Sequence, residues 1–473
     1  MLKREFLYNV FFLLFLFTTS NIWGQISPEV QAPKKLTGNW NGIRTTLVNN
    51  GVNIETIYTG EIISNLQGGI SNRSEYLDVM DLMLDVNLND LIRWKGANFY
   101  TDILGIHGKN PSDYVGDFQG VSNIAANNSW KIFEIWMQQN LWDNKFSVLM
   151  GMYDLNSEFD VLESAGLFIN SSFGMGAEFA QSGKNGPSTF PATAMTFRIK
   201  TQINEHFCFQ TAILDGVPDD AKNSWGLNSI INKQEGALLT SEIIFTTENK
   251  TVKRFQNHSR RKQYLRLGLR FNKKRKFLGR SNRSTKQNQK LGRRRKQHTG
   301  ALFNTSKQMY SKIAIGGWYY TSDFNYIESE NLEQYQGSWG IYGLWEKNVF
   351  SKQDKAGEDL NAFLRVGISD GQTNQVDTYC GSGLVYSGIF SKFYQDQIGL
   401  AIAAAHNSDN FKSKMLKNGE TPDSWEINFE LSYRAEINEW CSIQPDVQYI
   451  INPGFNPTLK NAVVFGTRLE ICF

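Results

Sequence analysis

The stretch Asn461-Ala-Val-Val-Phe-Gly-Thr-Arg-Leu-Glu-Ile-Cys-Phe473 decides the fold class of this chain. Counting back from Phe473 to Val463, every second residue is apolar except Thr467, whereas the positions between them include Arg468 and Glu470. A β-strand directs alternate side chains to opposite faces, so this segment predicts a strand with one apolar and one polar face. Ending on such a strand is typical of a barrel whose apolar face meets lipid and whose polar face lines a lumen. A soluble β-sandwich is the alternative.

The N-terminus indicates secretion. Lys3 and Arg4 precede the nearly uninterrupted apolar run Phe6–Phe17, and a polar stretch follows it. This order of regions predicts a signal peptide at residues 1–24. An N-terminal membrane anchor is the alternative, but the apolar run is short for crossing a bilayer. A secreted chain of amphipathic strands is expected in the outer membrane of a Gram-negative cell.

Segments of alternating polarity recur sixteen times along the chain. They lie near 52–64, 77–91, 96–108, 130–142, 145–153, 193–203, 205–215 and 236–247, and then near 311–321, 338–350, 361–369, 378–390, 398–407, 425–438, 441–452 and 461–473. A closed bacterial barrel has an even number of strands, and sixteen strands leave room for an aqueous channel. We therefore predict an all-β, transmembrane antiparallel barrel over residues 52–473.

The connections between these segments alternate in length. Short connections are expected at 92–95, 143–144, 204 and 439–440, and long ones at 65–76, 109–129, 154–192, 216–235, 322–337 and 408–424. In bacterial barrels the short turns face the periplasm and the long loops face outward. A loop as long as 154–192, here called the constriction loop, is usually functional. We expect it to fold into the lumen; a solvated surface loop is the alternative.

Other chemistry finds little support in the sequence. The chain has four widely spaced cysteines, Cys208, Cys380, Cys441 and Cys472, and their spacing suggests no metal site. None of its five histidines lies in a recognisable catalytic motif. We predict no metal, no cofactor and no enzymatic activity. An outer-membrane barrel enzyme and a secreted β-rich carbohydrate-binding protein remain as alternatives, and solubility without detergent would identify the latter.

Several motifs follow one another in a fixed order. They include Leu36-Thr-Gly-Asn-Trp40-Asn-Gly42-Ile-Arg44, Glu134-Ile-Trp136-Met-Gln138, Gly151-Met-Tyr-Asp154-Leu-Asn156 and Ile443-Gln444-Pro445-Asp446-Val-Gln448-Tyr449. In this order the chain resembles the carbohydrate-selective porin family, the OprB type, over nearly the whole mature sequence except about 249–310. The resemblance implies a channel that passes sugars passively, a partly helical periplasmic segment at 25–51, and an inward-folded third loop. It also implies mono- or oligosaccharide substrates and contact with outer-membrane lipid and lipopolysaccharide, and it is compatible with a homotrimer.

Strand parity places polar side chains on the lumen face, where they can exchange hydrogen bonds with sugar hydroxyls. The candidates for the pore lining are Glu61, Asp81, Asp85, Glu134, Trp136, Gln138, Arg198, Lys200, Arg365, Glu430, Arg434, Asp446, Gln448 and Arg468, with Asp154, Asn156 and Glu158 on the constriction loop. Each of them could instead be a solvated charge or part of an Arg–carboxylate pair that braces the wall.

Charge is distributed unevenly. Residues 249–300 contain 20 Lys and Arg and no Asp or Glu, whereas the remainder beyond the signal peptide contains 27 basic and 45 acidic residues, a net charge of −18. An acidic conduit repels anions and favours neutral solutes and cations. This balance favours sugars over phosphate-type anions as substrates.

The basic segment at 249–310 departs from the family pattern. By topology it replaces a periplasmic turn, and blocks of like charge are usually disordered. Secretion argues against nucleic acid as its partner. Three interpretations stay open: an insertion without function, a docking element for an anionic periplasmic partner, and an additional hairpin that would raise the strand count to eighteen.

We predict that trypsin cleaves the basic segment from the periplasmic side only, because its cleavage sites are dense and topology places it there. Protease added to intact cells should leave the segment uncut, whereas spheroplasts should show a nicked chain with a surviving barrel. Cleavage on intact cells would reverse the topology, and resistance from both sides would indicate a folded hairpin.

Overall fold

The structure is a computed structural model that describes residues 35–218, 235–247, 310–327, 334–351, 358–390 and 396–473. The expected signal peptide and the basic segment up to residue 309 lie outside the described residues, so the expectations made for them stay predictions. Residues Lys34–Phe473 belong to one compact unit, which contains all of the described elements.

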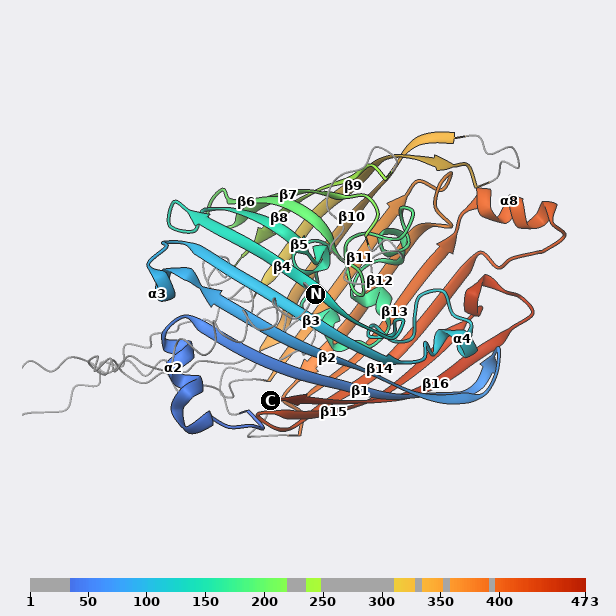
Figure 1. The fold of residues 1–473 in the computed structure, drawn as a ribbon. Coiled ribbons are helices and arrows are strands. Elements are labelled where there is room, and N and C mark those ends of the chain that lie inside the picture. The colour runs from blue at the N-terminus through green and yellow to red at the C-terminus, as the bar shows by residue number, and fades with distance from the viewer. Residues whose placement is uncertain (1–34, 219–234, 248–309, 328–333, 352–357, 391–395) are drawn as a thin grey trace, which may run out of the picture. The chain divides into compact units, whose positions relative to one another are not determined.

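The described residues form one closed barrel of sixteen antiparallel strands, each paired with its sequence neighbours, with the first strand paired to the last (Figure 1). The strands are β1 (Val52–Gly69), β2 (Arg73–Asn87), β3 (Ala97–Gly108), β4 (Ser129–Leu141), β5 (Phe146–Tyr153), β6 (Ala194–Gln202), β7 (Phe207–Asp215), β8 (Ala237–Thr246), β9 (Ser311–Asn325), β10 (Gln334–Ser351), β11 (Asp359–Ser369), β12 (Val376–Ser387), β13 (Gln397–Asn407), β14 (Trp425–Asn438), β15 (Cys441–Ile451) and β16 (Lys460–Cys472). The predicted fold class and strand number are confirmed.

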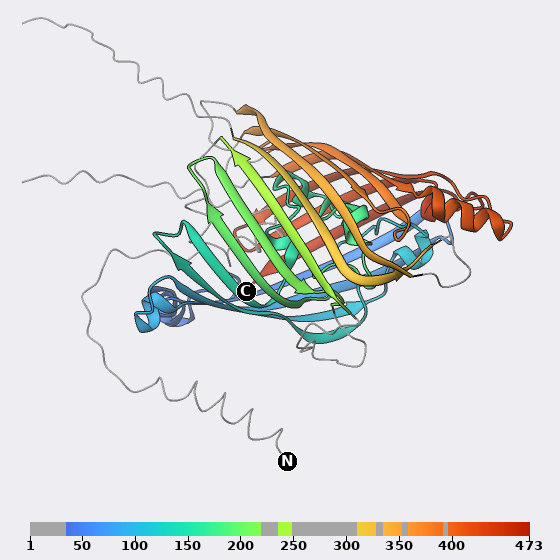
Figure 2. The ribbon, with the colours of Figure 1, turned by 90° about the horizontal axis from the view of Figure 1, so that it is seen from above.

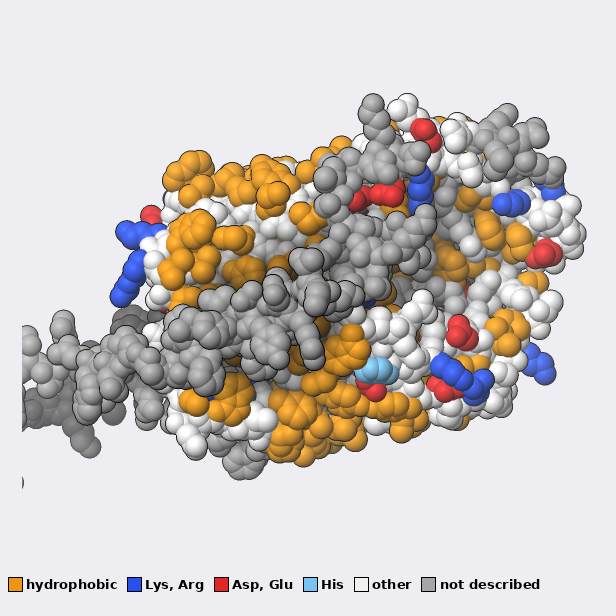
Figure 3. Space-filling view, in the orientation of Figure 1, with side chains coloured by type: hydrophobic (Ala, Val, Ile, Leu, Met, Phe, Trp, Pro, Cys, Tyr) orange, Lys and Arg blue, Asp and Glu red, His pale blue; other side chains and the backbone are white. Residues whose placement is uncertain are grey.

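Alternation of side chains explains why these segments pair as a barrel. In β16 the inward Arg468 and Glu470 are buried, whereas the outward Phe465 and Leu469 are exposed. Hydrophobic side chains gather over the strands on the outer surface, and most Lys and Arg lie toward the two ends (Figure 3). The polarity is therefore reversed relative to a soluble protein, as a lipid-facing barrel requires.

Short helices occupy the connections and the N-terminal segment. They are η2 (Trp40–Gly42), α2 (Ile43–Asn49), α3 (Leu88–Ile92), α4 (Ser112–Val115), η3 (Leu155–Ser157), η4 (Ser164–Leu167), η5 (Ser171–Phe173), α5 (Ala177–Ala180), α8 (Asp409–Lys417) and η6 (Pro453–Phe455). None of the helices in the described ranges has the length and hydrophobicity needed to cross a bilayer.

Two predicted long connections are shorter in the structure. Only residues 70–72 separate β1 from β2, where the sequence predicts a loop at 65–76, and only 326–333 separate β9 from β10, where it predicts 322–337. The strands continue because their backbone groups stay paired through bulges, for example between Asn65 and Gly69 of β1. Polar residues in this stretch therefore belong to the rim of the wall, since pairing overrides their loop-like composition.

The N-terminal segment closes over the end of the last strand. The backbone N–H of Leu36 donates to the carbonyl of Cys472 at 3.0 Å, and Nη1 of Arg44 donates to the carbonyl of Phe473 at 3.0 Å. The same guanidinium lies 4.2 Å over the ring of Trp40, which holds it in place. The carbonyls at the end of β16 thus gain partners from a segment that precedes the first strand.

Arg44→Gln should lower the stability of the folded barrel by about 1–3 kcal/mol, because the charge-assisted bond to the chain end is lost. The temperature at which the folded band converts to the unfolded band on a gel measures this. Lys95→Gln, at an exposed position in the β2–β3 connection, is the matched control. Equal conversion temperatures for the two variants would show that the hydrogen bond from Arg44 to the end of the chain does not stabilise the barrel.

Candidate functional site

The constriction loop lies within the ring of strands (Figures 1 and 2), and inward side chains of the wall bind its backbone. The carboxylate of Glu430 accepts the N–H groups of Ile169 at 2.5 Å and Asn170 at 3.1 Å. Elsewhere along the loop, Glu346 accepts the N–H groups of Ser164 at 2.5 Å and Glu163 at 3.3 Å. Each carboxylate thus holds two consecutive peptide groups, which are buried at Glu430 and partly buried at Glu346.

The loop between β3 and β4 is held in the same way. Glu426 accepts the N–H groups of Phe118 at 2.7 Å and Gln119 at 2.9 Å. The backbone N–H of Ser171 donates to the carbonyl of Gly120 at 2.8 Å, which joins this second loop to the constriction loop. Both loops are therefore fixed to the wall and to each other.

Arg365 of β11 binds the constriction loop most extensively. Its Nε lies 3.0 Å from Oδ1 of Asp160, and its Nη2 donates to the carbonyl of the same residue at 2.7 Å and to that of Gly174 at 3.0 Å. Its Nη1 donates to the carbonyls of Ser172 at 3.0 Å and Phe173 at 2.9 Å. The guanidinium is buried, and its rigid fork of donors suits several fixed carbonyls at once. Arg365 therefore folds the loop back on itself.

Glu158 anchors the first turn of the loop to β6. Its carboxylate lies 2.9 Å from Nε of Arg198 and 2.7 Å from Nζ of Lys200, and it accepts the hydroxyl of Tyr153 at 2.6 Å. Arg198 also donates to the side-chain amide of Gln138 at 2.8 Å. The charges of the two cations and the carboxylate compensate one another, and the ion pairs hold the start of the loop against the wall.

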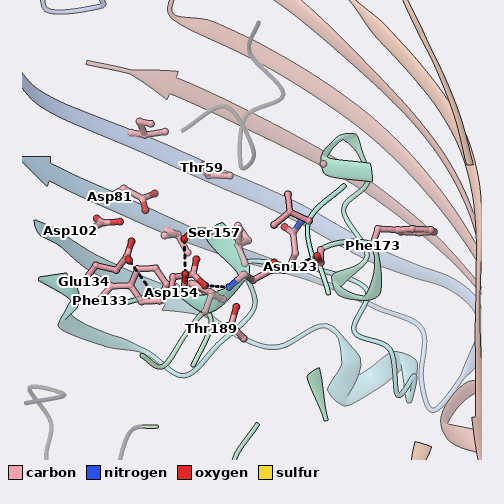
Figure 4. Close-up of a pocket in the computed structure, with 18 of the residues that line it drawn as sticks. Thr59, Asp81, Asp102, Asn123, Phe133, Glu134, Asp154, Ser157, Phe173 and Thr189 are labelled. Carbon is pink, nitrogen blue, oxygen red and sulfur yellow. Dashed lines mark hydrogen bonds between the residues drawn. The ribbon is translucent and has the colours of Figure 1, made fainter. Parts of the chain in front are cut away.

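A cavity of about 150 Å³ separates the constriction loop from the wall formed by β1–β4 and β16. Three aromatic rings, those of Phe168, Phe173 and Phe190, lie along its loop side. Its polar lining comes from strands and loops that are far apart in the sequence and comprises Thr59, Asp81, Asp102, Asn123, Glu134, Asp154, Asn156, Ser157, Thr189 and Arg468 (Figure 4). The cavity joins apolar and polar surface, which is the composition of a site for a small polar ligand.

Acidic groups dominate the strand side of this cavity. Asp102 of β3 stands directly opposite Glu134 of β4, and Asp81 lies on the adjacent strand β2 (Figure 4). Oε1 of Glu134 accepts the backbone N–H of Asp154 at 2.8 Å and the indole N–H of Trp136 at 3.2 Å. The strand side of the cavity is therefore acidic.

Arg468 is the one basic residue among the lining residues of the cavity. Its Nε donates to Glu61 at 2.6 Å, and its Nη2 donates to the side chain of Asn123 at 2.5 Å. Ser122 donates to the second oxygen of Glu61 at 2.8 Å. The ion pair of Arg468 and Glu61 therefore links the paired strands β1 and β16 to the loop between β3 and β4 at the edge of the cavity.

The structure brings five of the sequence candidates together in the cavity lining: Asp81, Glu134, Asp154, Asn156 and Arg468. Others bind protein groups in the barrel, since Arg434 pairs with Glu470 at 3.1 Å and Gln448 donates to Asp446 at 3.2 Å and to the carbonyl of Val121 at 2.8 Å. Asp85 lies half-buried on β2, outside the cavity lining.

Several residues of the site are absent from the sequence candidates. Strand parity already places Asp102 on the lumen face, and Glu346 and Glu426 also face inward at alternating strand positions, so parity alone could have found them. Asn123, Ser157 and Thr189 lie in loops without periodicity, and no sequence signal marks them.

Two loop carboxyls change their acidity because they are buried. Burial, together with the charge of Asp160, raises the pKa of Glu178 to about 8, and burial raises the pKa of Asp160 to about 6 although Arg365 opposes this. Neither oxygen of Glu178 has a hydrogen-bond partner among the described residues. Glu178 is therefore neutral at pH 7 and packs in the loop as an uncharged group.

Comparison with known proteins gives consistent matches. The family described as carbohydrate-selective porin, OprB family, matches residues 71–473. Porin B of Pseudomonas aeruginosa is 23% identical over 93% of this chain and 91% of its own length. Among solved structures, the high-pH structure of Pseudomonas putida OprB has a TM-score of 0.74 at 20% identity, covering 94% of this chain and all of that one. The low-pH structure of the same protein gives a TM-score of 0.54 at 17% identity, covering 93% of this chain and 98% of that one.

Arg365→Ala should raise single-channel conductance and blunt discrimination among sugars, because Asp160 and three other loop residues lose their partner. Arg434→Gln is the matched control, since Arg434 pairs within the wall and not with the loop. A folded Arg365→Ala channel with the conductance of the control would show that the loop holds its place without this residue.

The loop should become less stable as pH rises. Because folding raises the pKa of Glu178 from 4.5 to about 8, the stabilisation is complete below the unfolded value and is lost as pH rises through about 8. Current noise from loop motion should therefore increase between mildly acidic and alkaline pH. Glu178→Gln should abolish this increase, and an unaltered pH profile in that variant would disprove the assignment.

Proposed function

The chain belongs to the carbohydrate-selective porin family of the OprB type, and from this we propose that sugars pass its barrel in single file through the cavity beside the constriction loop. Membership makes the protein a passive sugar channel of the outer membrane and not an enzyme. The observation that carries the proposal is that loop and wall residues together line one cavity within the barrel.

The size of the cavity supports a preference for small sugars. Its volume is about 150 Å³. Pockets for drug-sized ligands are larger, at ~300–1,000 Å³. We infer that a single sugar ring passes more readily than an oligosaccharide.

The lining supports hydroxyl recognition without tight binding. Carboxylates such as Asp81 and Asp102 accept hydrogen bonds from sugar hydroxyls, and the amide of Asn123 can both donate and accept. Phe173 presents an apolar ring to the C–H face of a sugar. Conduction requires such contacts to be several and individually weak, so that the sugar leaves as easily as it arrives.

The acidic row supports discrimination by charge. Asp81, Asp102 and Glu134 come from adjacent strands on one side of the cavity, and Arg468 alone contributes a basic group to its lining. An acidic passage raises the energy of an anion inside it. We therefore infer faster uptake of neutral sugars than of sugar acids.

Liposome swelling tests this preference. The wild-type channel should pass glucose faster than gluconate, and Asp102→Asn should raise the gluconate rate about fivefold, the effect of ~1 kcal/mol between unit charges 4 Å apart in water. Asp143→Asn, which removes an exposed carboxylate in the β4–β5 turn, should leave the ratio unchanged. Equal rates for both solutes in wild type, or an identical ratio in both variants, would refute charge selection at this cavity.

A further inference from the structure

Two clusters on the outer surface of the barrel repeat the same three residue types. In the first, Nδ1 of His107 lies 3.0 Å from Oδ1 of Asp78, and its ring packs edge-on against Trp130 with centroids 6.0 Å apart. In the second, Nδ1 of His406 lies 2.7 Å from Oδ1 of Asp377, and its ring lies 4.7 Å from that of Trp425. Among the described histidines these two share this arrangement, and the sugar passage uses neither.

The two clusters occupy equivalent places in the barrel. Each takes its Asp from near the start of one strand, its His from the next-to-last residue of the following strand, and its Trp from the start of the strand after that. The strands are β2–β4 in the first cluster and β12–β14 in the second. Both clusters border long connections, 109–128 and 408–424, which mark the extracellular end of a bacterial barrel.

Their height along the barrel corresponds to the outer membrane interface. The indoles of Trp130 and Trp425 are exposed on the outer face, and below them on the same strands lie exposed apolar side chains such as Met137 and Phe429. Tryptophan prefers the level where acyl chains meet headgroups. The histidine beside each indole is therefore at headgroup level.

The hydrogen bond to Asp fixes each imidazole. A carboxylate only accepts, so Nδ1 carries a proton and Nε2 is directed away from the carboxylate. Within the described residues Nε2 of neither ring forms a hydrogen bond. A neutral ring would accept from a sugar hydroxyl at Nε2, and a protonated ring would donate to a phosphate oxygen there.

Cationic side chains stand nearby on the extracellular side of each cluster. Lys109 follows His107 of the first cluster by two residues, is more than half exposed and lies 3.9 Å from Glu75. Lys412 of α8 reaches the second, where it pairs with Asp409 at 2.8 Å and donates to Ser424 at 3.3 Å. These cations suit phosphate groups, which attract both Arg and Lys.

We propose that the two Asp–His–Trp clusters bind the phosphorylated sugar headgroups of outer-leaflet glycolipid. The indole packs at the boundary between acyl chains and sugar, Nε2 of the histidine binds a hydroxyl or phosphate oxygen, and the neighbouring cation binds phosphate. The clusters thereby hold the barrel at a fixed depth from two places on its circumference.

Binding of purified lipopolysaccharide to the full mature protein in detergent tests this proposal. The lipid-dependent rise in the unfolding temperature gives an affinity, which should fall about tenfold when His107→Gln and His406→Gln are combined, the effect of one bond to a charged group. His206→Gln is the matched control, because His206 packs against Phe245 at the periplasmic end. Liposome swelling with glucose should be unchanged in all variants, since the clusters lie outside the lumen.

Three outcomes overturn the proposal. One is wild-type affinity in the double histidine variant, or, if that variant fails to fold, in Asp78→Asn combined with Asp377→Asn. Another is an equal loss in the His206→Gln control. The third is an equal rise in unfolding temperature with phosphatidylglycerol, which would indicate general attraction of anionic lipid instead of headgroup recognition.

Discussion

The backbone of the constriction loop sets the constraint on which the rest of this structure depends. Irregular backbone placed inside a barrel loses water from its peptide groups and must find other partners. Here the wall supplies them: Glu346 and Glu430 accept loop N–H groups, and Arg365 donates to loop carbonyls. The charged interior is therefore in large part the support of the loop, and the passage is the space that remains.

Charge is distributed unevenly around the lumen because some inward side chains support the constriction loop and others line the cavity. Where the loop touches the wall, acids and bases have protein partners, as Glu158 has in Arg198 and Lys200. Along β2–β4, the acidic side chains of Asp81, Asp102 and Glu134 line the cavity beside the loop. An acidic lining raises the energy of an anion inside the cavity.

Much of the barrel could be predicted from sequence because strand parity is local. Alternation alone assigns Arg468 and Glu470 to the inward face and Phe465 and Leu469 to the outward face, and the structure agrees. The site could be predicted from the sequence only in part, because its contacts join residues that are far apart in the chain. Arg365 and Asp160 are far apart in sequence, and nothing near either residue identifies the other. Parity places Glu430 on the lumen face, but it cannot show that loop amides occupy its carboxylate.

The central claim is that the loop holds the same position in the conducting channel as in this structure, and tethering tests it most directly. In a chain whose four cysteines are replaced by serine, Ser164→Cys and Glu346→Cys can be joined by a short bis-maleimide, which adds to both thiols. We predict efficient linkage, with sugar uptake and conductance unchanged. Failure to link, or transport that changes once the loop is tied to the wall, would contradict the claim.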